Sequence, residues 1–293
     1  MSSGFYTMSE ADEVAQLTEG GRTPRLALAR LRFSPDLESA FVEYHFQQSL
    51  TLIRLAAILA FVLYALFGVL DLSIVPEVAY DFIDVTCELL ELAAAADCFC
   101  FGTLAQRGST SRLTLHRLLD AAEKSVKLLD INLRKDCFFR ETITESLTRA
   151  DVLKLNLPEA HYLAELFEIS LSSLPDFCAE MIEEWSLACC LVTLGEHGAL
   201  AASAKGEQVY VPGYQVNVVD TCGSGDAFAA GFIHEYLGGK SLADCVRLGN
   251  ALGTMIAMTR GATNPVSIEE VRHFLKAKHA RFHEPSLQPF DVG

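Results

Sequence analysis

Positive charge is scarce in this sequence. Its 293 residues carry 23 lysine and arginine side chains against 38 aspartate and glutamate side chains, a formal net charge of −15. Most of such a surface repels phosphate backbones and no local basic patch offsets it, so we expect no nucleic-acid partner. Repeats, low-complexity tracts and a signal-peptide pattern are lacking too, while 51% of the residues are hydrophobic. This composition excludes disordered and fibrous proteins and allows one large α/β domain or two smaller ones.

The front of the chain lacks lysine, and the cysteines lack the spacing of metal ligands. All eight lysines lie between Lys124 and Lys278, and the five basic residues of the first 76 positions are all arginine. The front of the chain therefore has the composition of a piece with a different origin. The nine cysteines are scattered and odd in number. They are typical of reduced thiols that act as small buried hydrophobes, which predicts a cytoplasmic location.

Residues 55–70 form a run of sixteen residues without charge. At about 1.5 Å per residue, an α-helix over this run covers about 24 Å, short of the roughly 30 Å hydrocarbon core of a bilayer. Extended to about residues 50–75, the run predicts either a membrane-spanning helix or a fully buried helix, and both interpretations stay open. Arginines before the run and acidic residues after it favour a cytoplasmic N-terminus, which would send the remainder across the membrane.

Short β-like runs alternate with helical patterns from about residue 76 onward. We expect strands at residues 97–101, 126–131, 152–155, 190–193, 199–202 and 208–211. We expect helices at residues 111–124, 140–147, 158–167, 176–185, 225–237, 242–259 and 267–279. This order predicts an α/β fold in which helices cover both faces of a mostly parallel sheet, with ligands at the carboxyl ends of the strands.

The stretch VVDTCGSGDAFAAG, residues 218–231, carries the most chemical information. Gly223, Ser224 and Gly225 form a turn that leads into a helix, and the free N–H groups at such a helix start suit a phosphate or a developing oxyanion. Asp226 follows at once. A carboxylate beside a phosphate site can serve as the base that accepts a proton from an attacking hydroxyl. The alternative is that Asp226 only caps the helix and the glycines only turn the chain.

Three further groups follow predicted strands. Asn156 and Glu159 stand three residues apart at a helix start, where they either organise the water shell of Mg²⁺ or form an N-cap with an acidic first turn. Thr193, Gly195 and Gly198 belong to TLGEHG, which either lets backbone approach a nucleotide or simply turns between two strands. The segment DINLR ends a strand with acidic, amide and guanidinium groups that can face a polyol or phosphates.

The glycine-rich signature and these three groups occur in the order found in the ribokinase-like sugar kinases, the phosphofructokinase B type, which the chain resembles over about residues 77–285. The segments AYDFI, CFGTLAQR and DINLR are most similar to the fructokinase branch. The resemblance implies a three-layer α/β/α fold and ATP-dependent phosphorylation of a primary hydroxyl of a small sugar, fructose above all. It also implies ATP and Mg²⁺ as cofactors and K⁺ as a stimulating cation. A homodimer is a separate expectation, because the edge of an incomplete sheet exposes strand backbone that favours pairing with another chain.

The resemblance also implies a role for each matching residue. Asp226 is the base, and the N–H groups of Gly223, Ser224, Gly225 and Asp226 form an anion hole. Asn156 and Glu159 organise Mg²⁺ through water. The remaining residues surround the nucleotide, the cation or the sugar: Thr193, Gly195, Gly198 and Asn250 for the nucleotide, Asp220 and Thr221 for the cation or phosphates, and Asn132 and Arg134 for the sugar.

The front of the chain departs from the family pattern. Gly20 and Gly21 imitate the sugar-binding GG loop, but Arg25 stands where its asparagine belongs. Residues 33–77 instead resemble the first membrane segment of some bacterial adenylate cyclases. We therefore predict a helical segment over residues 1–76, membrane-associated through about residues 50–75, and a ribokinase-like domain over residues 77–293 that is incomplete at its N-terminal side. The predicted function is an ATP-dependent sugar kinase, and the alternative is a catalytically impaired, nucleotide-binding, membrane-anchored fusion protein.

Overall fold

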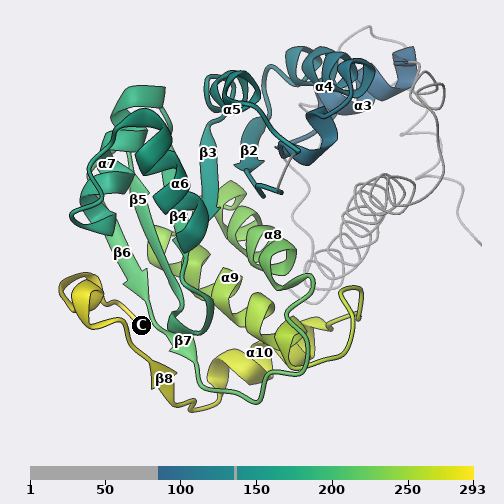
Figure 1. Cartoon of the computed structure of the whole chain (residues 1–293). Coiled ribbons are helices and arrows are strands. Elements are labelled where there is room, and N and C mark those ends of the chain that lie inside the picture. Colours follow the sequence, from purple (N-terminus) through teal and green to yellow (C-terminus); the bar gives the residue numbers. More distant parts are fainter. Residues whose placement is uncertain (1–84, 135–136) are drawn as a thin grey trace, which may run out of the picture. The chain divides into compact units, whose positions relative to one another are not determined.

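The computed structural model of the chain describes residues 85–134 and 137–293 (Figure 1). By its internal contacts the chain divides into residues 1–69 and 70–293. The expected helix over residues 50–75 and the predicted join near residue 76 lie outside the described residues. Within the described ranges, no helix is both long enough and apolar enough to cross a bilayer.

Six strands form the main sheet of the described part, in chain order across the sheet. They are β1 (Cys98–Phe101), β2 (Val126–Asp130), β3 (Val152–Asn156), β4 (Cys189–Thr193), β5 (Ala199–Ser203) and β6 (Gln208–Val211). The first four run parallel, and β5 and β6 are antiparallel to their neighbours. Each strand lies within one residue of its predicted position, so the mostly parallel sheet is confirmed.

Helices cover both faces of this sheet (Figure 1). They are α3 (Cys87–Ala95), α4 (Ser109–Ala121), α5 (Arg140–Leu147), α6 (Leu157–Phe167), α7 (Leu174–Trp185), α8 (Ser224–Leu237), α9 (Leu242–Ala257) and α10 (Ile268–Lys276). One hydrophobic core joins the sheet to α5, α6 and α7, and the other joins it to α8 and α9. The described residues thus form the predicted three-layer α/β/α arrangement.

Side chains of β3 alternate between these two cores. Leu153 and Leu155 are fully buried on the face of α6 and α7, whereas Val152 is fully buried on the face of α8. Burial on both faces explains why a parallel strand is an apolar run. Lys154 interrupts this run and is nevertheless buried, with 6% of its surface exposed.

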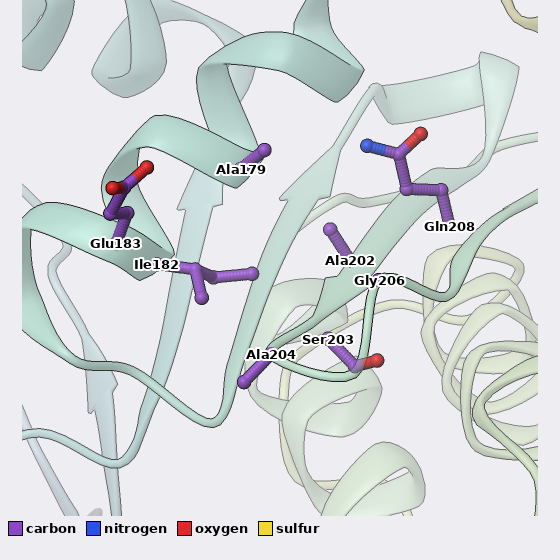
Figure 2. A pocket seen from close by; sticks show the side chains of 8 residues that line it. All are labelled: Ala179, Ile182, Glu183, Ala202, Ser203, Ala204, Gly206 and Gln208. Carbon is purple, nitrogen blue, oxygen red and sulfur yellow. The ribbon is translucent and has the colours of Figure 1, made fainter.

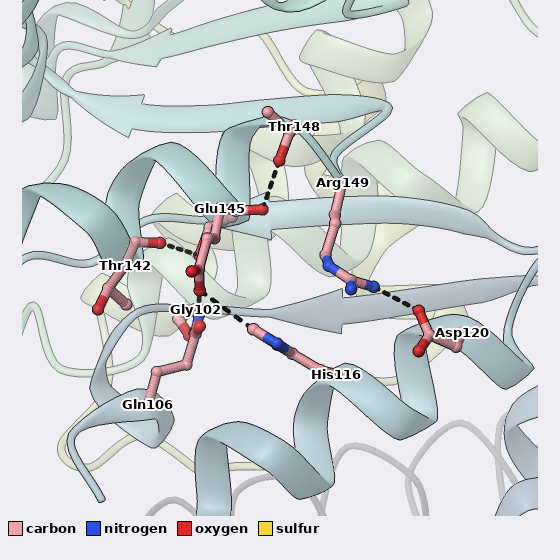
Figure 3. A network of polar contacts seen from close by, with 9 residues as sticks. Gly102, Gln106, His116, Asp120, Thr142, Glu145, Thr148 and Arg149 are labelled. Atoms are coloured by element: carbon pink, nitrogen blue, oxygen red, sulfur yellow. Dashed lines mark hydrogen bonds and ion pairs between the residues drawn. The ribbon is translucent and has the colours of Figure 1, made fainter. Parts of the chain in front are cut away.

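A polar network ties the end of β1 to α5 (Figure 3). The Gln106 Nε2 group, in the short 3₁₀ helix after β1, donates to the carbonyl oxygen of Gly102 at 3.0 Å and to Ser146 Oγ at 2.8 Å. Arg149 pairs with Asp120 of α4 at 2.6 Å. The two Gln106 hydrogen bonds hold the loop that leaves the carboxyl end of β1, the edge at which the expected site lies.

A second, two-stranded sheet was not expected from the sequence. It consists of β7 (Gly213–Tyr214) and β8 (Arg281–Phe282), which pair antiparallel. The guanidinium carbon of Arg281 lies 3.6 Å from the centre of the Tyr214 ring. Such a cation–π contact helps to hold the end of the chain against the strand that follows β6.

Candidate functional site

The N-terminus of α8 is open. Gly223 precedes the helix with φ +80°, and a Cβ atom there would lie 2.8 Å from the Cβ of Ala262, so the position requires glycine for both conformation and space. No side chain in the described ranges caps the helix. The Ser224 N–H donates to the Thr221 carbonyl oxygen at 3.2 Å, and its expected role as an anion donor stays a prediction. The N–H groups of Gly223, Gly225 and Asp226 find no acceptor among the described residues.

Asp220 holds the loop that leads into α8. Its Oδ1 accepts from the Cys222 N–H and its Oδ2 from the Gly261 N–H, both at 3.0 Å. These two hydrogen bonds lower the pKa of the Asp220 carboxyl below its ordinary value. Asp220 thereby links the signature loop to the loop after α9. The neighbouring Thr221 is exposed, and contact of either residue with a cation stays a prediction.

Asp226 lies in the first turn of α8, and no residue of the described part forms a hydrogen bond or ion pair with its carboxylate. The residue keeps contact with solvent, yet the surrounding protein removes enough water to raise the pKa of its carboxyl. The negative charge of Asp130 raises this pKa further, while Lys154 and Arg134 lower it. An unpaired carboxylate with a raised pKa suits a proton acceptor.

The carboxyl ends of β2 and β3 bring two charges beside Asp226. Asp130 and Lys154 are register partners on these strands, and Lys154 Nζ lies 2.6 Å from Asp130 Oδ2. The sequence reasoning missed Lys154 as a site residue. A lysine inside the otherwise apolar run VLKL was the signal that could have found it.

The loop after β2 carries the two expected sugar residues. Asn132 adopts a left-handed backbone with φ 41°, which asparagine tolerates better than most residues. Arg134 is exposed, and its charge acts on Asp226. Between them, the Leu133 N–H donates to Glu159 Oε1 at 2.9 Å. The structure therefore places this loop beside both α6 and α8, and contact with a sugar stays a prediction.

Asn156 and Glu159 form a capping box at the start of α6. Asn156 Oδ1 accepts from the Glu159 N–H at 2.9 Å, and Glu159 Oε2 accepts from the Asn156 N–H at 2.8 Å. Glu159 is 7% exposed, and its burial raises the pKa of its carboxyl. The capping alternative is thus confirmed. Each of these oxygens accepts one backbone N–H, and contact of the pair with Mg²⁺ through water stays a prediction.

The expected nucleotide residues gather around the turn from β4 to β5. Thr193 Oγ1 donates to the carbonyl oxygen of Leu155 at 3.2 Å. Gly198, with φ +90°, is required by packing, because a Cβ there would lie 2.1 Å from the carbonyl oxygen of Val211. Gly195 has open space around it. Asn250 of α9 is 7% exposed, and its amide Nδ2 donates to the same Val211 oxygen at 2.9 Å. This hydrogen bond ties α9 to the end of β6.

A cavity of about 350 Å³ lies elsewhere, between α7 and the turn from β5 to β6 (Figure 2). Ile182, Glu183, Ser203 and Gln208 contribute to its lining, and no expected site residue does. Among the described residues, no cluster of three histidine, cysteine or acidic side chains could hold a metal ion. The open start of α8 therefore remains the candidate site.

This fold and helix start define a three-layer α/β protein that can bind an anion beside a free carboxylate. Comparisons with known proteins agree with that class. A family model described as pfkB family carbohydrate kinase matches residues 76–269. The chain therefore belongs to the pfkB family of carbohydrate kinases.

Individual relatives are more distant. Fructokinase-1 of Oryza sativa subsp. japonica is 26% identical over 199 residues, which cover 62% of this chain and 60% of that protein. An ATP-dependent ribose-1-phosphate kinase of Halopiger xanaduensis is 34% identical over 134 residues, or 46% of this chain and 42% of that protein. The crystal structure of fructokinase with bound ATP from Xylella fastidiosa shares the fold, with a TM-score of 0.56 at 18% identity over 64% of this chain and 63% of that one. The chain spans between 40% and 60% of the length of these and similar curated relatives.

Proposed function

We propose that this protein transfers the γ-phosphate of ATP to a primary hydroxyl of a small sugar. The observation that carries the proposal is the open start of α8, where three N–H groups and the adjoining Asp226 carboxylate have no hydrogen-bond partner among the described residues. Free N–H groups at the positive end of a helix bind a phosphoryl group, and a carboxylate beside them can take a proton from the attacking hydroxyl. Membership of a carbohydrate kinase family supports the same reaction.

Each group at the site has a separate task in this reaction. Asp226 accepts the hydroxyl proton as the sugar oxygen bonds to the γ-phosphorus and the bond to ADP breaks. The N–H groups of Gly223 and Gly225 stabilise the charge on the transferred group. Mg²⁺, when bound, would neutralise charge on the ATP phosphates, and Asn156 and Glu159 would hold it through its water shell. Asn132 and Arg134 are proposed to orient the sugar.

Fructose is the first candidate for the sugar. Fructokinases of Oryza sativa and Arabidopsis thaliana are 26% and 27% identical to the chain, and DINLR resembles the fructokinase branch. The test is ATP-dependent ADP release by the full-length chain with fructose, ribose, ribose 1-phosphate and nucleosides, with ³¹P NMR to locate the new phosphate. We expect the highest kcat/KM with fructose. Release of ADP with none of these acceptors would refute the proposal.

Nucleotide binding without turnover is a second candidate. It is motivated by the family match, which begins at residue 76 and leaves the preceding residues unmatched. Phosphoryl transfer depends on the positioning of the reactants and on the exclusion of water from the site, whereas nucleotide binding alone does not need both. ATP binding measured by calorimetry, without sugar-dependent ADP release, would favour this candidate.

Association and cation effects complete the proposal. We expect residues 50–75 to bring the protein to a membrane, the kinase domain to remain cytoplasmic, the protein to form a homodimer, and K⁺ to stimulate turnover. Flotation with liposomes, light scattering and replacement of K⁺ by Na⁺ test these expectations separately. Absence from the lipid fraction, a monomeric mass, or equal rates in both salts would contradict the corresponding one.

A further inference from the structure

The two thiols of β1 lie side by side. Cys98 and Cys100 are separated by one residue, and successive side chains of a strand point to opposite faces, so both thiols lie on the face of α8 and α9. Phe99, between them, packs on the other face. The two sulfur atoms are 3.8 Å apart, and one thiol donates a hydrogen bond to the other. This strand therefore presents a pair of free thiols in direct contact.

Access to solvent distinguishes this pair from a second pair of contacting thiols. Cys178 and Cys190 also form a hydrogen bond with each other, but both are fully buried and out of reach of a dissolved oxidant. Cys100, by contrast, is exposed, and Cys98 is half-buried. The prediction that the thiols act as small buried hydrophobes is thus wrong for Cys100, and this thiol is open to chemical modification.

The hydrogen bond between the two thiols favours the thiolate of Cys100. With Cys98 as the donor, this bond lowers the pKa of the Cys100 thiol, although loss of water and the charges of Asp130 and Asp226 act in the opposite direction. The same bond raises the pKa of the Cys98 thiol. A thiolate is the form that attacks a peroxide, and a neighbouring thiol then condenses with the product. Cys100 therefore suits the first of these two steps and Cys98 the second.

The carboxyl end of β1 is tied to the end of β2. A Cβ atom built on Gly102 would lie 2.7 Å from the carbonyl oxygen of Asp130, so the two chain segments approach closely. Thr103 Oγ1 donates to the carbonyl oxygen of Ile131 at 2.9 Å. The loop of residues 132–134, which carries the predicted sugar contacts, follows directly. A change in the path of β1 would therefore displace this loop.

We propose that Cys98 and Cys100 are a modification site at which a peroxide forms a reversible disulfide, and that this disulfide displaces the loop of residues 132–134. The Cys100 thiolate attacks one oxygen of hydrogen peroxide, the O–O bond breaks, and uptake of one proton leaves a sulfenic acid and water. The Cys98 thiol then attacks the oxidised sulfur; the S–S bond forms, the S–O bond breaks, and the hydroxyl group leaves as water with the thiol proton. The two thiols are oxidised by two electrons, and the peroxide is reduced to two molecules of water.

Formation of this disulfide requires β1 to bend. The two sulfur atoms must approach from 3.8 Å to about 2.05 Å. Two residues of an extended strand span about 6.6 Å between their Cα atoms, close to the upper end of about 6.8 Å for a disulfide. Within the described part of the chain, β1 pairs with β2 alone, so one side of the strand is free to move. The disulfide is therefore strained, and a dithiol should reduce it readily.

Mass spectrometry of the full-length protein tests the disulfide directly. After treatment with hydrogen peroxide and blocking of the free thiols, cleavage after glutamate gives the peptide of residues 92–123, in which Cys98 and Cys100 are the only cysteines. We expect this peptide to lose two hydrogens and to regain them on treatment with dithiothreitol. The buried Cys178 and Cys190 should stay reduced. A sulfinic acid, a disulfide between two chains, or two unmodified thiols in the peptide would overturn the inference.

Three variants test the separate roles of the two thiols. Cys98→Ser should stop at a sulfenic acid on Cys100, which dimedone traps, whereas Cys100→Ser should give little trapped product. Cys87→Ser is the matched control, because Cys87 is an exposed thiol of α3 outside the pair. It should form the disulfide as the wild type does. Equal trapping in Cys98→Ser and Cys100→Ser would contradict the assigned roles.

The effect on turnover rests on the proposed function and is measured separately. Cys222→Ser serves as the background, because Cys222 is exposed and adjoins the start of α8. Oxidation should lower kcat/KM for the sugar by about 10- to 100-fold, since a displacement of about 1 Å can cost about 100-fold in rate. Dithiothreitol should restore kcat/KM, and Cys100→Ser in the same background should prevent the loss.

The two measurements separate the possible failures. An oxidised protein that carries the disulfide and keeps its full kcat/KM would overturn the proposed displacement of the loop. If the reduced protein phosphorylates no sugar, the proposed function fails, whereas the mass of the peptide of residues 92–123 still decides whether Cys98 and Cys100 form the modification site.

Discussion

The helices α6 and α8 begin in nearly the same way and end up with opposite properties. In α6 the N-cap is Asn156 and the third helical residue is Glu159; in α8 these positions are Gly223 and Asp226. Side chains close the start of α6, and both Glu159 oxygens accept backbone hydrogen bonds. At the start of α8, three N–H groups and one carboxylate have no partner within the part of the chain that the structure describes. A glycine at the N-cap, which has no side chain to offer, makes the difference.

At one edge of the sheet, the start of α6 serves the stability of the fold and the start of α8 serves the proposed chemistry. A satisfied helix start lowers the free energy of the folded state, whereas an open start leaves donors for a ligand. We expect loss of the α6 cap to act on stability and loss of the Asp226 carboxylate in α8 to act on turnover. Four predictions test this division, in order of decreasing effect.

Asp226→Asn should have the largest effect on activity. Loss of the general base is expected to lower kcat by roughly 10²- to 10⁴-fold while ATP binding persists. Asp176→Asn is the matched control, since Asp176 is the third residue of α7 and lies away from the site. Steady-state kinetics of the two variants measure the difference. Equal activity of Asp226→Asn and wild type would remove Asp226 from the mechanism.

Glu159→Ala should have the largest effect on stability. It removes the partner of the Asn156 and Leu133 N–H groups in a buried position, at a cost of about 2–4 kcal/mol in the free energy of unfolding. Glu270→Ala breaks the capping box of α10, where Glu270 is exposed, and should cost about 1 kcal/mol or less. Urea denaturation of both variants tests the comparison. Similar losses of unfolding free energy in the two variants would show that burial of the α6 cap does not increase its contribution to stability.

Gly223→Ala should destabilise the protein by about 1–3 kcal/mol through its positive φ and the contact with Ala262. Gly206→Ala is the control, because Gly206 has a similar φ of +82° but open space around it. The difference between the two unfolding free energies isolates the contact. If the two losses were equal, packing against Ala262 would not constrain the start of α8.

The pH dependence should show the smallest effect. Partial loss of water and the charge of Asp130 raise the pKa of Asp226, so kcat/KM should fall on acidification at a pH above the value of about 3.9 for an ordinary aspartate. The raised pKa also means that ionised Asp226 disfavours the folded state, so Asp226→Asn should be no less stable than wild type at pH 7. Any gain in the stability of Asp226→Asn over wild type should vanish as the pH falls below the ordinary pKa of an aspartate. If kcat/KM fell only at or below about pH 3.9, the pKa of Asp226 would not be raised.

Local patterns predicted much of the fold. The six strands were placed within one residue and the seven expected helices within three. The sequence did not reveal α3, and the pairing of β7 with β8 escaped prediction because it joins Gly213 to Phe282, far apart in the chain. At the site, the pattern of Asn156 and Glu159 allowed a cap or a metal role. The hydrogen bonds that confirm the cap could be seen only once the backbone was placed.

The sequence by itself determined the alternation of strands and helices and the glycine-rich helix start, because hydrophobic periodicity and glycine act over a few residues. Only the tertiary structure decided which charges meet there. Asp130, Lys154 and Gly225 come from three separate segments, and their contact depends on the parallel register of β2 and β3 and on the packing of α8 against one face of the sheet. Side chains alternate between faces along a strand, so a shift of one residue in register would have turned Lys154 away from α8.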